Sequence, residues 1–105
     1  MITAEVTRKQ GRYFSFSCRG HAEYDDPGKD IVCSAVSMLV INTANAIDKF
    51  TETRIEGSDE DHISWHFPDK PDDKAELLMN AMLLGLKEIE TKYGNDYLRL
   101  MIKEV

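Results

Sequence analysis

Two residues, Cys33 and His21, have the side chains and the sequence neighbours that nucleophilic catalysis needs. Asp30 stands directly before an apolar run that begins at Ile31, and we expect Asp30 to be the N-cap of a helix. Cys33 then falls in the first helical turn, where unpaired N–H groups and the helix dipole favour an anion. A thiolate is such an anion, and it is the species that attacks a carbonyl carbon. This placement predicts that Cys33 is a nucleophile.

A sulfur nucleophile also needs a group that transfers protons, and His21 is the best candidate in the sequence. It follows Gly20, which permits an unusual backbone turn at the end of a predicted strand. The connection that starts at His21 leads into the helix of Cys33, so the strand end and the helix start can face each other. We therefore predict a Cys33–His21 dyad. The alternative is that Cys33 only packs, as buried cysteines on apolar helices commonly do.

Three neighbours are predicted to support this dyad. The backbone N–H groups of Cys33 and Ser34 are expected to stabilise the oxyanion of a tetrahedral intermediate. Asp30 is expected either to cap the helix or to orient His21. Ser37 lies one turn beyond Cys33 and shares its helix face, where it either supports the site or packs.

The second cysteine, Cys18, lies on the apolar face of a predicted strand and is expected to pack in the core. A Cys18–Cys33 disulfide stays open as an alternative, although a cytoplasmic location disfavours it. His62 and His66 share one face of a later strand, but no third ligand lies near them in the sequence. We expect no metal and no cofactor.

The elements that position these side chains follow from the hydrophobic periodicity. In chain order we predict strands at 2–8 and 12–19, a helix at 31–50, strands at 51–56 and 62–67, a helix at 72–92 and a strand at 97–105. This ββαββαβ order predicts a single two-layer α+β domain over residues 1–105, with a five-stranded sheet and two helices. The first helix is apolar nearly all round and is expected to be central and buried.

The periodicity also predicts which side chains face the core. In the strand at 12–19, one face is expected to carry Phe14, Phe16 and Cys18. In the second helix, the apolar side is expected to consist of Leu77, Leu78, Ala81, Leu84, Leu86 and Ile89. Asp72 or a neighbour is expected to cap that helix, and Gly94 is expected to end it.

Charge and composition narrow the choice of function. The chain has 105 residues and a net charge of −6, which disfavours direct binding to a phosphate backbone and favours a basic partner. The N-terminal residues do not form a signal peptide, and the apolar stretch at 31–41 is too short to span a bilayer. A cytoplasmic protein without a membrane partner is therefore expected.

The segments Gly20-His21-Ala22 and 28–37, the latter containing Asp-Ile-Val-Cys, closely resemble the ribosomal-processing cysteine protease family, called Prp. The pattern is far more specific than a lone Cys–His pair, and the size and element order match over the whole length. The resemblance implies a peptidase that removes a short N-terminal extension from large-subunit ribosomal protein 27. It also implies that His21 and Cys33 are catalytic.

The resemblance further implies a homodimer, cleavage between an aromatic and a small residue, and a His–Cys loop that closes over the substrate peptide. Gly20 and Gly28 would then be loop hinges. Pro27, directly before Gly28, is a departure from the pattern that would stiffen one side of such a hinge. Two rival functions remain at this point: a non-catalytic module that binds a ribosomal protein or assembly intermediate, and another thiol enzyme.

Overall fold

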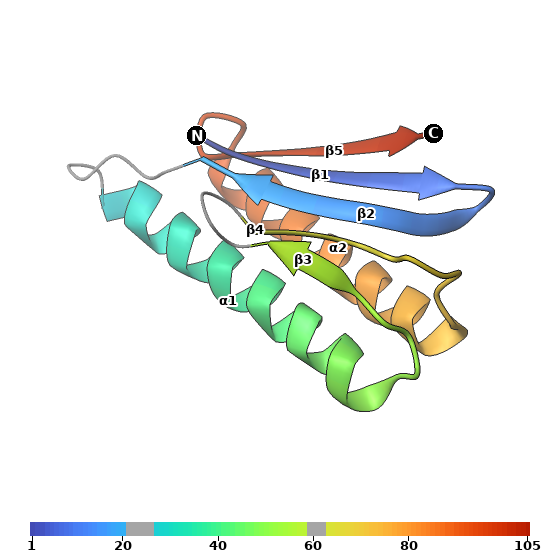
Figure 1. The fold of residues 1–105 in the computed structure, drawn as a ribbon. Coiled ribbons are helices and arrows are strands. Elements are labelled where there is room, and N and C mark those ends of the chain that lie inside the picture. The colour runs from blue at the N-terminus through green and yellow to red at the C-terminus, as the bar shows by residue number, and fades with distance from the viewer. Residues whose placement is uncertain (21–26, 59–62) are drawn as a thin grey trace.

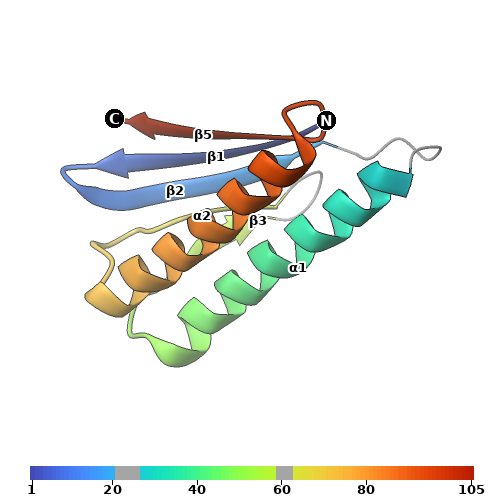
Figure 2. The same cartoon turned by 180° about the vertical axis from the view of Figure 1, so that it is seen from behind.

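A five-stranded sheet forms one layer of the molecule, and both helices lie on the same face of that sheet (Figures 1 and 2). The computed structural model describes residues 1–20, 27–58 and 63–105. The elements are β1 (Ile2–Lys9), β2 (Arg12–Arg19), α1 (Pro27–Phe50), β3 (Glu56–Ser58), β4 (Ile63–His66), α2 (Asp73–Tyr93) and β5 (Leu98–Glu104). The predicted ββαββαβ order and the two-layer α+β class are confirmed.

The strand order in the sheet is β3-β4-β2-β1-β5. β5 runs parallel to β1, whereas the other neighbouring strands are antiparallel, so the sheet is mixed. β1 and β2 are joined by Gln10 and Gly11, whose φ angles are 54° and 78°. Positive φ at both central residues is typical of a type I′ turn, whose twist matches that of the two strands.

A β-bulge in β2 changes which side chains reach the core. Thr7 pairs with Ser15 but Arg8 pairs with Tyr13, so Phe14 is an extra residue opposite β1. Phe14 is consequently 38% exposed, whereas Tyr13 is only 5% exposed. The prediction that Phe14 shares the buried face of Phe16 is therefore wrong, because strict alternation does not survive the inserted residue.

Helix α1 begins earlier than predicted. Its first residue is Pro27, which suits that position because proline has a helical φ and lacks the N–H that would remain unpaired. Asp30 therefore lies inside the helix, and its predicted role as the N-cap is wrong. Gly28 also lies in the first helical turn, so it is not a hinge within a loop.

Only one side of α1 faces the core. The side chains buried there recur at helical spacing and are Val32, Val36, Val40, Thr43 and Ile47. Met38 is 67% exposed and Ile31 and Ile41 are also exposed, so the expectation of a helix buried all round is wrong. By length and composition alone, Ile31–Phe50 is apolar enough to cross a membrane, contrary to our expectation from the shorter run. Its buried stripe instead packs in the core beneath the sheet.

The segment between α1 and β3 is not a strand before Glu56, although a strand was predicted from Thr51. The Thr51 hydroxyl donates to the Ile47 carbonyl, and the Thr53 N–H donates to the Thr51 hydroxyl. The Asp72 N–H in turn donates to the Thr53 hydroxyl. These local side-chain bonds offer the backbone an alternative to strand pairing and tie the end of α1 to the start of α2.

Helix α2 is capped as predicted, but a different side faces the core. The Asp72 carboxylate accepts a hydrogen bond from the Ala75 N–H, and Gly94 ends the helix with a bond from its N–H to the Glu90 carbonyl. The buried residues are Ala75, Met79, Met82, Leu83 and Leu86. Of the predicted face, Leu77 and Leu84 are exposed. The helix has apolar residues on two sides. The side that is buried is the one that contacts β5, β2 and α1.

Candidate active site

Cys33 lies in the second turn of α1 and is half-buried at the edge of the core. A half-buried thiol has both packing support and access to solvent, which a nucleophile requires. Cys18 lies on β2 opposite Ala4 of β1 and Ile63 of β4, and it also packs against the core. The predicted packing role of Cys18 is therefore confirmed, and both cysteines are free thiols.

The thiol of Cys18 has a shifted pKa. Burial, together with a smaller electrostatic effect of the neighbouring Cys33, raises the pKa of Cys18 to about 11. Cys18 is therefore a neutral thiol at physiological pH and a poor nucleophile. The electrostatic effect also shows that Cys33 lies near Cys18, so the fold brings the first part of α1 to the end of β2.

Gly20 determines how the chain leaves β2. Its φ is 111°, and a Cβ built there would lie 2.2 Å from the Met1 carbonyl oxygen. Any side chain would therefore be strained by the backbone conformation and would clash with β1. The unusual turn predicted at Gly20 is confirmed. His21, the next residue, lies outside the described residues.

The helix start at Pro27 removes the predicted oxyanion donors. In a regular helix, the N–H groups of Cys33 and Ser34 bond to carbonyls four residues earlier, which here are also helical. The unpaired N–H groups of α1 instead belong to its first turn, at Gly28 and Lys29. The prediction that Cys33 and Ser34 donate these bonds is therefore wrong.

The remaining supporting residues have distinct positions on α1. Ser37 is half-buried one turn after Cys33, so these two side chains share a flank of the helix. Ser34 is exposed. Among the described residues, no group of three or more His, Cys, Asp or Glu side chains gathers as metal ligands would.

The raised pKa of Cys18 predicts that this thiol is alkylated slowly in the folded protein. At about pH 8, only about one Cys18 side chain in a thousand is ionised, given its pKa of about 11. Iodoacetamide should therefore modify Cys33 in the folded protein and reach Cys18 only after unfolding. Mass spectrometry of tryptic peptides over time measures both reactions, and faster modification of Cys18 would contradict this account of the site.

Comparison with known proteins places this chain in a recognised family. Residues 1–98 match the family model described as Cysteine protease Prp. The ribosomal processing cysteine protease Prp of Staphylococcus aureus is 33% identical over 107 residues, covering 98% of this chain and 100% of the relative. The Prp of Bacillus subtilis is 32% identical over 104 residues, covering 91% of this chain and 93% of the relative.

Solved structures show the same fold. The crystal structure of S. aureus Prp with a substrate peptide has a TM-score of 0.87 and 31% identity, covering 97% of this chain and 99% of that chain. The structure of S. aureus Prp with a covalently linked product peptide has a TM-score of 0.86 and 32% identity, with the same coverage. A Streptococcus mutans protein has a TM-score of 0.86 and 28% identity, covering 100% of this chain and 96% of that chain.

Proposed function

Because the chain belongs to the Prp family of cysteine proteases, it is a cysteine peptidase, and we propose that Cys33 is its nucleophile and His21 its proton-transfer group. We propose further that its substrate is large-subunit ribosomal protein 27 with an N-terminal extension. The enzyme would remove that extension in the cytoplasm.

The choice of nucleophile rests on one observation, the raised pKa of the other cysteine. Both cysteines are half-buried, but burial raises the pKa of Cys18 to about 11, while Cys33 lies on a flank of α1. A peptidase of this type attacks as a thiolate, so the cysteine that stays protonated is the unsuitable one. The S. aureus relative has been crystallised with a covalently linked product peptide, and a covalent intermediate on Cys33 agrees with such chemistry.

His21 is the proposed base because of the position of Gly20, the residue before it in the chain. Gly20 ends β2 beside Met1, and Cys18 lies two residues earlier on that strand near Cys33. His21 directly follows Gly20 in the sequence. In the proposed reaction, the imidazole takes the Cys33 proton and returns it to the leaving amine as the thioester forms. Water then hydrolyses the thioester and frees the thiol.

The first turn of α1 is the proposed oxyanion site. Its unpaired N–H groups at Gly28 and Lys29 precede Cys33 by four to five residues, or roughly 6–7 Å along the axis. Side chains on a helix tilt toward its N-terminus, so the Cys33 sulfur leans toward these donors. Asp30 is then proposed to orient His21, since it does not cap the helix. Ser37 is proposed to support Cys33 from the following turn.

The substrate class agrees with the charge of the protein. A net charge of −6 favours a basic ribosomal protein as the partner, through faster encounter and correct orientation. S. aureus Prp has been crystallised with a substrate peptide, so a relative with the same fold binds a peptide. The site of this chain is proposed to bind the N-terminal segment of its precursor in the same way.

The outer face of the helix layer is the proposed dimer contact. It carries Ile31, Met38 and Ile41 on α1, and Leu77 and Leu84 on α2, all exposed. The two helices lie side by side on one face of the sheet (Figure 2) and pack on each other where Leu39 meets Gly85. These exposed side chains are about half a helical turn from the buried ones, so they face away from the core. An apolar surface of this kind is typical of a contact between proteins, and a second copy of the chain is the proposed occupant.

A lysine in this stripe should therefore weaken the dimer. Leu84 is 66% exposed, so its replacement neither leaves a cavity in the core nor overpacks it. Because an unpaired ammonium would be buried in the contact, Leu84→Lys should raise the dissociation constant at least about tenfold. Analytical ultracentrifugation measures the constant, with Asn95→Lys in the α2–β5 turn as the matched control. Equal effects of the two substitutions would refute the assigned face.

The test of the proposed function is incubation with a peptide that copies the N-terminus of the cell's own precursor of ribosomal protein 27. Mass spectrometry of the products should show two fragments whose masses sum to the peptide plus one water. A peptide that binds but keeps its mass would instead support the alternative of a non-catalytic binding module. An unchanged mass without binding would refute the proposed substrate.

A further inference from the structure

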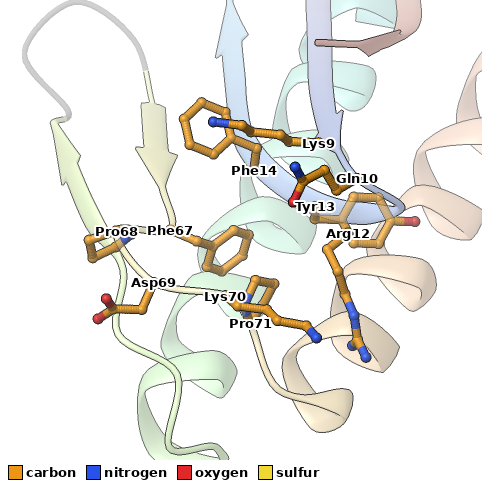
Figure 3. Close-up of a pocket in the computed structure, with 10 residues that line it drawn as sticks. All are labelled: Lys9, Gln10, Arg12, Tyr13, Phe14, Phe67, Pro68, Asp69, Lys70 and Pro71. Carbon is orange, nitrogen blue, oxygen red and sulfur yellow. The ribbon is translucent and has the colours of Figure 1, made fainter.

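A pocket of about 350 Å³ lies at the far end of the sheet from Cys33, between the β1–β2 turn and the segment that joins β4 to α2 (Figure 3). Its apolar lining includes Phe14, Phe67, Pro68 and Pro71. Phe14 lies four residues before Cys18 on β2, or about 13 Å along the strand. The pocket is therefore separate from the peptidase site, although its volume is within the range of ligand sites.

Two lysines give this pocket a positive charge. Arg12 is neutralised by Asp73 at 2.9 Å, and Asp69 lies 3.6 Å from Arg54. Lys9 lies on the β1–β2 side of the pocket and Lys70 on the β4–α2 side (Figure 3), and no ion pair joins either ammonium to a carboxylate within the described parts of the chain. In a protein with a net charge of −6, two uncompensated ammonium groups at one opening select an anionic ligand.

The backbone holds this arrangement in place before any ligand binds. The bulge in β2 turns Phe14 outward, where the Lys9 ammonium lies 5.5 Å from the centre of its ring. The Phe67 N–H donates to the Phe14 carbonyl at 2.9 Å, which fixes one wall against the other. Gln10 is the non-glycine residue with a positive φ in the described chain, and it also lines the pocket. Bulges and unusual backbone conformations commonly occur where a binding site needs a redirected side chain.

The chemistry of the lining favours a peptide over a phosphate group. The side-chain amide of Gln10 can donate and accept at once, which matches a peptide backbone group. The guanidinium of Arg12, the group best suited to a bidentate phosphate contact, is already paired with Asp73. Phenylalanine and proline rings offer a surface for an apolar side chain.

We propose that this pocket binds an acidic peptide segment in which carboxylates flank an apolar residue. The apolar residue would lie on Phe14 and the prolines, and the carboxylates would meet Lys9 and Lys70. Such a site would let the enzyme hold an acidic partner protein while the distant Cys33 site remains free.

The proposal can be tested by titrating the isotope-labelled full chain with the blocked peptide acetyl-Glu-Leu-Pro-Glu-amide and recording amide NMR shifts. We expect saturable shifts at Gln10, Phe14 and Lys70, and weaker binding of the Gln-Leu-Pro-Gln peptide. Combining Lys9→Gln and Lys70→Gln should weaken binding about fivefold or more, from the usual strength of exposed charge contacts. Lys49→Gln, on the last turn of α1, is the matched control and should bind normally.

Three results would overturn the proposal. The first is no shift at the pocket with millimolar peptide, and the second is equal binding of the acidic and amide peptides. The third is tighter binding of adenosine monophosphate than of the acidic peptide, which would assign the site to nucleotides. Cleavage of the precursor peptide by the double lysine variant should remain normal, so failure here and failure of the proposed peptidase function give different results.

Discussion

Replacing Cys33 by alanine is expected to lower the rate of precursor cleavage by more than about a thousandfold, because the covalent route is lost together with the sulfur. Cys33 is half-buried at the core edge, and alanine retains the helix, so the variant should remain folded. The rate is measured by mass spectrometry of the extended peptide over time, and circular dichroism confirms the fold.

Cys18→Ala is the matched control, because it removes the other thiol near the same site. Cys18 is a neutral thiol with a pKa of about 11, so its loss should affect stability more than cleavage. A Cys33→Ala protein that still trims the precursor would exclude the proposed nucleophile. Loss of cleavage in Cys18→Ala, with the fold intact, would favour a redox mechanism that needs both sulfurs.

His21→Ala should lower cleavage by about a hundredfold to ten thousandfold, which is the usual contribution of a positioned acid–base group. The effect should fall on kcat more than on KM, because the proton transfer occurs in the reaction step and contributes little to peptide binding. The pH profile gives a second readout, since the variant should lose the limb that reports the imidazole.

His66→Ala is the control for this experiment. His66 is exposed on β4, where its Nε2 lies 3.4 Å from a Glu56 carboxylate oxygen, and it has no proposed part in the reaction. Equal losses in the two histidine variants would argue for a general effect on stability. An unchanged pH profile in His21→Ala would assign the proton transfer to another group.

Helix α1 starts earlier than the sequence predicted. This changes the expected mechanism, whereas the proposed catalytic residues stay the same. With Asp30 as the N-cap, Cys33 would have both its sulfur and its own N–H at the helix terminus. With Pro27 as the first residue, the sulfur and the unpaired N–H groups belong to consecutive turns. The proposed nucleophile and the proposed oxyanion donors are then separate parts of one helix.

The order of elements was predictable from the sequence because it depends on local pattern. The alternation in β1, the long apolar run of α1 and the Asp72 cap of α2 each act within a few residues. The candidate residues could also be predicted from the sequence, because a cysteine near a helix start and a histidine after a glycine are local features. The roles of His21 and Cys33 remain proposals that the experiments above test.

Other features depended on contacts between segments far apart in the chain. The bulge that exposes Phe14 is a property of two paired strands, and the choice between the two apolar sides of α2 depends on α1 and the sheet. The neighbourhood of Cys18 and Cys33 arises only when α1 packs beneath β2. Sequence alone therefore determined the elements and the candidate chemistry of this protein, since both are encoded by neighbouring residues. Tertiary structure alone decided which side chains face inward and raised the pKa of the Cys18 thiol, because burial depends on the whole fold.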